Sequence, residues 1–313
     1  IWAISFIRNN YYFKLNALFS GLYLNKKFKQ NIHNFRRNIH RIEKGLIYKN
    51  PKKVFAEDYI YQTVELLKLN KDKCYIDENT LSWGEAVLDK YFKICTHTVE
   101  IKKSFIVYCV VRSHNYNHLD WVPYEEFNRP AISVGYEDLL VLSIRRRSVR
   151  FFQDKTVEKE YVEKAMEIAK YSPSACNRQA FKFLFYNDKE TVEKISLIPG
   201  GIEGYTLPSV VVIVGCYSGY FDERDINAPV IDASLAAMSF IYSLETLGLS
   251  SVCINWPCNR DKETKIRKVV NLNTDEFIIM LIGIGWADKF GKIPFSSKKP
   301  VNVLLEINKH IIN

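Results

Sequence analysis

Four arginines and a serine lie within the six residues from Arg145 to Arg150. An arginine fork can hold two phosphate oxygens at once, and the hydroxyl of Ser148 would add a compact neutral donor. This pattern is typical of a phosphate site. The C-terminal end of a helix also favours cations, so the cluster is equally consistent with an exposed helix end. The residues alone leave both interpretations open.

A second polar stretch, Ser172 to Gln179, reads Ser-Pro-Ser-Ala-Cys-Asn-Arg-Gln. Small hydroxyl and amide side chains beside a proline make a rigid, donor-rich edge for a flat heteroaromatic ring with carbonyl and ring-nitrogen acceptors. The same residue types favour ordinary turns, so this stretch alone decides nothing. A third stretch, Gly248–Pro257, indicates a helix stop followed by a short strand.

Histidine and cysteine usage narrows the chemistry. None of the six histidines lies between residues 119 and 309, so we expect no hydrolase triad and no histidine metal site in that region. The seven cysteines are scattered, without the two-residue spacing of a zinc or dithiol motif, which predicts reduced thiols, a cytoplasmic protein and no metal. Cys253 and Cys258 are interpreted as ordinary strand-end residues.

Apolar patterns predict the elements that must position these residues. Short β-branched runs predict four strands, at 181–186, 209–215, 251–255 and 277–285. Helical spacing predicts helices at 58–69, 83–94, 138–147, 156–170 and 229–247. The helix at 156–170 would begin with Thr156 as its cap. The helix at 229–247 is apolar on more than one face and must be buried in a core or a subunit interface.

The net positive charge of the chain comes from its N-terminal part. The net charge is +9, yet residues 1–53 carry 12 Lys and Arg against one acid, Glu43. Residues 1–30 interleave these cations with aromatic residues, as a membrane-surface contact would. A helix packed over the rest of the protein fits the same pattern and is favoured, whereas nucleic-acid binding is not expected. We find no apolar run long enough for a membrane-spanning helix.

In this order and spacing, the motifs resemble those of the nitroreductase superfamily of FMN-dependent oxidoreductases, over roughly residues 137–307. The similar stretches are Arg146–Arg150, the Pro-Ser-x-x-Asn loop in Ser172–Gln179, Gly248–Trp256, Gly283–Trp286 and Ser297–Pro300. The chain departs from the family pattern at Ala180, where proline is common. A short glycine-rich stretch, Ile198–Gly204, also replaces a longer excursion beside the substrate pocket.

The resemblance implies site roles. The FMN phosphate, ribityl chain and pyrimidine edge would be held by Arg146, Arg147, Ser148 and Arg150, with Lys298 as a second cation at the phosphate. The family is homodimeric with FMN at the interface, so the partner subunit would contribute Pro173, Ser174 and Asn177. The backbone of Asn255 and Trp256 would lie beside the flavin N5 and O4. No catalytic side chain is implied, because the flavin carries the hydride.

We therefore expect an α+β fold: a mixed, mostly antiparallel sheet flanked by helices, in a homodimer. Residues 1–135 would form a basic, aromatic-rich helical extension, and residues 136–313 a nitroreductase-like FMN-binding domain. The segment 38–46 resembles one in nitroreductase-like proteins of bacterial surface-polysaccharide gene clusters, which implies a small-molecule or sugar-linked substrate.

Two functions follow. The first is an FMN-dependent oxidoreductase that uses NAD(P)H or another donor and an unidentified acceptor. The second is a non-catalytic flavin-fold scaffold that docks through its basic N-terminus on a membrane or a biosynthetic complex. In either case the protein would be cytoplasmic or peripheral to the inner face of the membrane.

Overall fold

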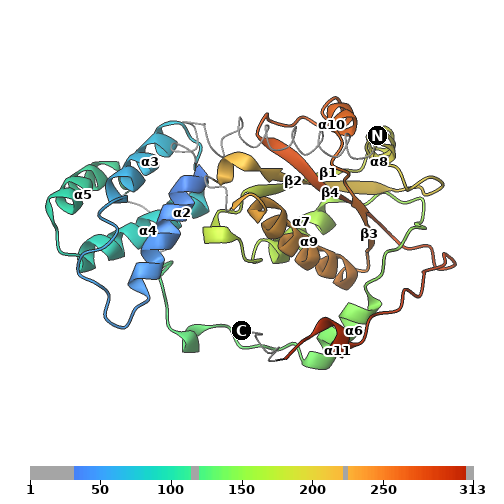
Figure 1. Cartoon of the computed structure of the whole chain (residues 1–313), viewed down its shortest axis with the longest axis horizontal. Helices are drawn as coiled ribbons and strands as arrows, with labels where there is room; N and C mark the ends of the chain where they lie inside the picture. The colour runs from blue at the N-terminus through green and yellow to red at the C-terminus, as the bar shows by residue number, and fades with distance from the viewer. Residues whose placement is uncertain (1–31, 114–119, 221–224, 308–313) are drawn as a thin grey trace, which may run out of the picture.

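The computed structural model describes residues 32–113, 120–220 and 225–307. Within these residues the chain forms two units at opposite ends of the molecule (Figure 1). The helical unit comes first in sequence, and the sheet unit follows it. None of the helices in these ranges is long and apolar enough to cross a membrane. The predicted surface contact of residues 1–30 lies outside the described residues.

The helical unit consists of α2 (Ile32–Leu46), α3 (Ile60–Asp72), α4 (Glu78–Ile94) and α5 (Val99–Val111). These helices overlap the two predicted at 58–69 and 83–94. α2 is amphipathic, and Phe35, Ile39 and Ile42, spaced four and three residues apart, are fully buried in the core of the unit. Gly84 of α4 lets α2 approach closely, because a Cβ at this position would lie 2.5 Å from the ring of Phe35.

The sheet unit is built on four strands in the order β1-β2-β4-β3. Their bounds are β1 (Phe181–Tyr186), β2 (Ser209–Cys216), β3 (Ser250–Asn255) and β4 (Glu276–Gly285). All four strand predictions agree with these bounds to within one residue. The three strand pairings are antiparallel. Among the described residues, the parallel contact is the single bridge between Ser148 and Ser251, so the predicted mostly antiparallel sheet is confirmed.

Alternation along β2 gives the sheet two apolar faces. Val211 and Ile213 pack toward α7 (Lys159–Ala169) and α9 (Ala228–Thr246). Val210 and Val212 face the opposite way, toward α8 (Lys189–Leu197) and α10 (Arg260–Ile266). Helices therefore cover both faces of the sheet, and every side chain of β2 up to Gly215 is buried.

The predicted start of α7 is wrong. The helix begins at Lys159 with Glu158 as its N-cap, so Thr156 does not cap it. Val157 is fully buried, and its N–H donates to the hydroxyl of Ser209 at 3.3 Å. This tertiary contact holds residues 156 and 157 against the start of β2 and delays the helix.

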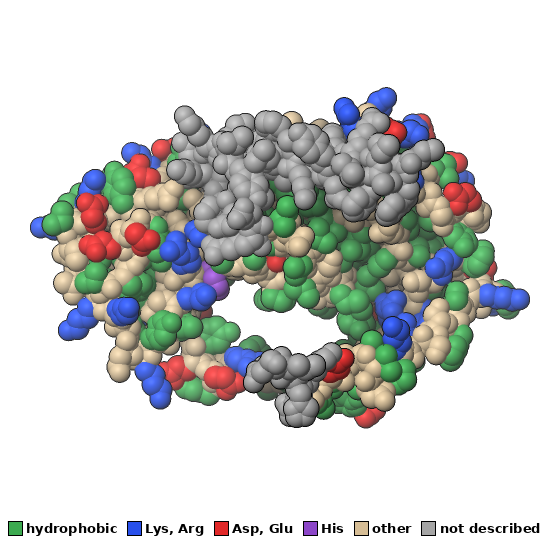
Figure 2. Space-filling view, viewed as in Figure 1, with side chains coloured by type: hydrophobic (Ala, Val, Ile, Leu, Met, Phe, Trp, Pro, Cys, Tyr) green, Lys and Arg blue, Asp and Glu red, His purple; other side chains and the backbone are tan. Residues whose placement is uncertain are grey.

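Residues 120–135, called the strap below, lie in the chain between the helical unit and the sheet unit (Figure 1). The strap contains the 3-10 turn η3 (Glu126–Asn128) and leads into α6 (Tyr136–Arg145), close to the helix predicted at 138–147. Apolar side chains on α6 are exposed in the single chain, and so are those on α11 (Val301–Leu304) and on one side of α9. The space-filling view shows an opening between the two units (Figure 2).

Candidate functional site

The predicted basic motif and the distant Lys298 meet at one small cavity. The cavity has a volume of about 140 Å³, and its lining includes Arg146, Arg147, Ser148, Arg150 and Lys298. No Asp or Glu lies among these described lining residues. A cavity of this composition has a strongly positive potential and suits a compact polyanion.

The end of α6 brings the motif to the sheet. The helix stops at Arg145, and Arg146 already has a non-helical conformation. The chain then runs beside the first residues of β3, where Ser148 bridges to Ser251 and the N–H of Val149 donates to the carbonyl of Ser251 at 3.0 Å. The motif is thus fixed to the edge of the sheet and is not a loose helix end.

Arg146 has a buried hydrogen-bond donor that could bind a ligand. Its Nε is buried and has no hydrogen-bond partner among the described residues. A buried guanidinium N–H without an acceptor is costly, since each buried donor that lacks a partner forfeits about 1–3 kcal/mol. A phosphate oxygen in the cavity would supply that acceptor, so the donor set fits a phosphate.

Arg147 and Arg150 also make contacts within the chain. Arg147 Nη2 donates to the carbonyl of Pro294 at 2.7 Å and to that of Phe295, which holds the segment before Lys298 against the motif. Arg150 Nη1 donates to the carbonyl of Ser148 at 3.1 Å. Arg147 therefore closes one wall of the cavity, and its predicted contact with a phosphate stays a prediction.

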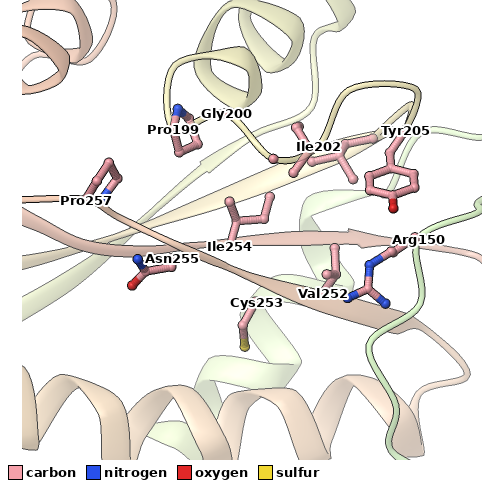
Figure 3. A pocket seen from close by; sticks show the side chains of 12 residues that line it. Arg150, Pro199, Gly200, Ile202, Tyr205, Val252, Cys253, Ile254, Asn255 and Pro257 are labelled. Atoms are coloured by element: carbon pink, nitrogen blue, oxygen red, sulfur yellow. The ribbon is translucent and has the colours of Figure 1, made fainter. Parts of the chain in front are cut away.

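A larger pocket of about 300 Å³ continues from Arg150 along β3 (Figure 3). Its other lining residues come from β3 and from a rim at 199–207, and they include Val252, Cys253, Asn255, Gly200 and Tyr205. β3 is the last strand of the sheet, so beyond the Ser148 bridge its outer edge presents backbone groups that no described strand pairs. A flat ring with acceptors and donors on one edge would match this edge.

Two anchors hold the rim in place. Tyr205 packs edge-on against Phe151, with ring centroids 5.8 Å apart. Lys262 Nζ donates to the carbonyl of Pro199 at 2.6 Å. Gly200 and Gly201 have positive φ, which explains the two glycines in the rim. The sequence signalled this rim only as a glycine-rich stretch, and it gave no sign of Tyr205.

The neighbouring residues Asn255 and Trp256 have different surroundings. Asn255 and Cys253 both line the pocket. Trp256 is 6% exposed and packs in the apolar core beneath β3, so its side chain does not line the pocket. Burial raises the pKa of the Cys253 thiol, and the charge of Arg146 lowers it in part.

The remaining predicted residues lie elsewhere in the chain. Pro173, Ser174 and Asn177 line neither the cavity nor the pocket. They belong to the loop after α7, whose 3-10 turn η4 spans Ala175–Asn177. The N–H of Ala175 donates to both carboxylate oxygens of Asp232 on α9, at 3.1 and 3.0 Å. Their predicted contribution from a partner subunit stays a prediction.

The family model and the curated relatives that match this chain are all nitroreductases by name. Residues 144–199 and 204–286 match the model of the nitroreductase family. Two curated archaeal proteins named "Putative NADH dehydrogenase/NAD(P)H nitroreductase" are similar to this chain. The protein of Archaeoglobus fulgidus is 24% identical over 151 residues, which cover 48% of this chain and 86% of that protein. The protein of Methanothermobacter thermautotrophicus is 28% identical over 154 residues, which cover 49% and 79%.

Two solved structures are also similar to this chain. An FMN-dependent nitroreductase from Clostridium difficile has a TM-score of 0.46 and 24% identity, covering 55% of this chain and 99% of its own. A nitroreductase family protein from Streptococcus pneumoniae has a TM-score of 0.47 and 22% identity, covering 54% and 99%. The family match and the two curated relatives show that residues 144–199 and 204–286 are similar to oxidoreductases of the nitroreductase family.

Proposed function

We propose that the protein is an FMN-dependent oxidoreductase that takes hydride from NAD(P)H and passes it to a second substrate. The observation that carries the proposal is the buried, unpartnered Nε of Arg146 in a cavity that also contains Ser148 and Lys298. Arg150 lines both this cavity and the pocket along the edge of β3. A phosphate at one end and a flat ring at the other is the shape of FMN.

Different residues would contact different parts of FMN. Arg146, Ser148 and Lys298 would bind the phosphate, and Arg150 would lie between the phosphate and the ring. The unpaired edge of β3 and the polar side chain of Asn255 would hold the edge of the ring and adjust its electron affinity. Bound flavin supplies the chemistry by accepting and donating hydride, so no protein nucleophile is needed.

The rim at 199–207 would shape the side on which substrates enter. It is short, and Pro199, Ile202 and Leu207 make it largely apolar. The names of the archaeal relatives favour NADH or NADPH as the donor. The acceptor is proposed to be a small or sugar-linked molecule, since residues 38–46 resemble proteins of polysaccharide gene clusters. A cytoplasmic location is part of the same proposal, with a membrane surface as the alternative contact of residues 1–30.

We also propose that the active form is a homodimer. The exposed apolar side chains of α6, α9 and α11 would be covered by a second copy of the chain. In such a dimer Pro173, Ser174 and Asn177 would complete the flavin site of the partner subunit. This arrangement explains why the loop lies away from the basic cavity of its own chain.

The first test is the absorbance spectrum of the protein as purified, followed by anaerobic addition of NADH and NADPH. We expect a flavin spectrum that either donor bleaches. Protein that is colourless and does not bind added FMN would overturn the proposal. Flavin that is bound but not reduced by any donor would instead favour a non-catalytic scaffold.

A further inference from the structure

The N-terminal helix α2 contacts the loop that is proposed to reach the flavin. Arg36 Nε donates to the carbonyl of Asn177 at 2.9 Å, and Nη2 donates to Oε1 of Gln179 at 2.8 Å. One turn earlier, His33 Nδ1 lies 3.1 Å from the carbonyl of Arg178. Three consecutive residues of the loop, 177 to 179, are thus bound by a helix of the other unit.

The loop has a conformation that needs outside support. Cys176, Asn177 and Gln179 have φ values of 54°, 51° and 51°, in the left-handed region that residues other than glycine seldom occupy. Such a conformation persists only where the surrounding structure holds it. Within its own unit the loop is held at its beginning, where the N–H of Ala175 donates to Asp232, and near its end, where Arg178 pairs with Asp225 at 2.9 Å and Gln179 Nε2 donates to the Lys170 carbonyl at 3.1 Å. The strained end of the loop is the part that α2 binds.

Arg36 is itself held firmly. Its Nη1 donates to the hydroxyl of Thr80 on α4, and its guanidinium lies over the ring of Trp83 at 5.1 Å. Trp83 in turn donates from Nε1 to Glu43 at 2.9 Å. The donors of Arg36 therefore have fixed directions before they meet the loop, so the loop must adapt to them.

We propose that Arg36 is a positioning residue for the flavin site. It holds Ser174–Gln179 in the conformation that presents Ser174 and Asn177 to the flavin of the partner subunit. This inference rests on the proposed function. Arg36 binds the main-chain carbonyl of Asn177, so this contact does not use the side-chain amide that would face the flavin. The helical unit would then be part of the cofactor site and not an appendage.

The main test compares Arg36→Ala with Arg41→Ala. Arg41 is on the same helix, but it stacks on Tyr59 at 3.6 Å and pairs with Asp58 at 3.9 Å within the helical unit. Both variants remove one positive charge. We expect Arg36→Ala to weaken FMN binding about tenfold, because it removes charge-assisted hydrogen bonds, while Arg41→Ala binds like the wild type. Quenching of FMN fluorescence during titration measures both constants.

A second readout does not depend on the flavin. The N–H groups of Asn177 and Arg178 bond to the carbonyls of Ser174 and Ala175, and that of Gln179 bonds to the hydroxyl of Ser174. Hydrogen exchange of these three amides in the FMN-free protein reports the order of the loop. We expect faster exchange in Arg36→Ala and no change in Arg41→Ala.

Gln179→Leu tests the contact from the other side, should Arg36→Ala fail to fold. It removes the acceptor Oε1 and nearly keeps the side-chain shape, and it also removes the bond from Nε2 to the Lys170 carbonyl. It should weaken FMN binding in the same direction. Wild-type affinity in Arg36→Ala and Gln179→Leu, with unchanged loop exchange, would overturn this inference alone. A wild-type protein that binds no FMN would overturn the proposed function and this inference with it.

Discussion

At the scale of single residues, Arg146 is the side chain on which the proposed phosphate site depends most directly. Its Nε is buried without a partner among the described residues, so a bound phosphate gains a full charge-assisted hydrogen bond there. We expect Arg146→Ala to raise the dissociation constant for FMN about ten- to a hundredfold. Equilibrium titration with FMN measures this change.

Arg129→Ala is the matched control for Arg146. Arg129 is exposed and pairs with Glu126 on the strap, away from the basic cavity. The control should bind FMN like the wild type if the loss in Arg146→Ala is local. Equal losses in the two variants would mean that only the net charge matters, and the assignment of Arg146 would then be wrong.

Alkylation of Cys253 can be used to detect FMN binding at the pocket along β3. Cys253 is an exposed residue in the lining of the pocket, and its side chain lies on the side of β3 away from the rim (Figure 3), so a ring bound across the outer edge of β3 would cover its thiol. Because burial raises the pKa of this thiol, alkylation should be slow near neutral pH and faster as the pH rises. We predict that saturating FMN protects Cys253 from alkylation at least severalfold, measured by mass spectrometry of peptides. Cys74 is exposed in the helical unit and should react equally with and without FMN.

At the scale of elements, the sequence predicted the strands well and the helix starts less well. Aromatic residues in β1 and β-branched residues in β2 to β4 have a strong local preference for strands, and they predicted all four strands to within one residue. The start of α7 depends on the contact of Val157 with Ser209, 52 residues away, and no local pattern reports such a contact. The basic motif and Lys298 line one cavity, as the motif pattern implied. The side chain of Trp256 lies in the core, and the predicted role of its backbone stays a prediction.

The exposed apolar face of α9 leads to a prediction about assembly. In the single chain Ile231 and Leu235 are 55% and 44% exposed, one turn apart on the helix. If a second copy covers them, the double substitution Ile231→Glu and Leu235→Glu should convert a dimer into a monomer, because it places charges in an apolar interface. Light scattering after size-exclusion chromatography measures the mass.

Ile106→Glu on α5 serves as the control for this face. Ile106 is also exposed on a helix, but it belongs to the helical unit. We expect this variant to keep the dimeric mass. A wild-type protein with monomeric mass at all concentrations would contradict the proposed interface.

At the scale of the whole molecule, the contact between the two units should respond to acid. Burial lowers the pKa of His33, and the hydrogen bond with the Arg178 carbonyl offsets this in part. The unfolded chain therefore takes up a proton near the ordinary value of 6.5, while the folded chain does so only at lower pH. The stability that neutral His33 contributes is present above that value and is lost as the pH falls below it.

We predict that the melting temperature falls less between neutral and mildly acidic pH in His33→Gln than in the wild type. Glutamine stays neutral across this range, so the change removes the protonation step. His40→Gln, on the same helix, is the control, because His40 lies beside Glu43 and not at the loop. Identical acid sensitivity in the wild type and in His33→Gln would contradict the prediction.

The contacts of Arg36 also mark the limit of sequence analysis for this chain. Arg36 lies 141 residues before Asn177, and nothing in the segment 38–46 or in the polar loop signals that they touch. Local pattern predicts elements and motifs, whereas the pairing of two units depends on shape across their whole interface. The role proposed for the helical unit therefore rests on contacts in the structure and not on the sequence.

The strap affects how strongly α2 and the loop at 177–179 associate. Because one continuous chain joins α2 to the sheet unit, the docking of Arg36 on its loop is an intramolecular event with an effective concentration on the order of millimolar. Tyr124, Phe127 and Ile132 on the strap are all more than 60% exposed, so a protease could cut there. After such a cut the two pieces would associate as separate molecules, and flavin affinity would begin to depend on protein dilution.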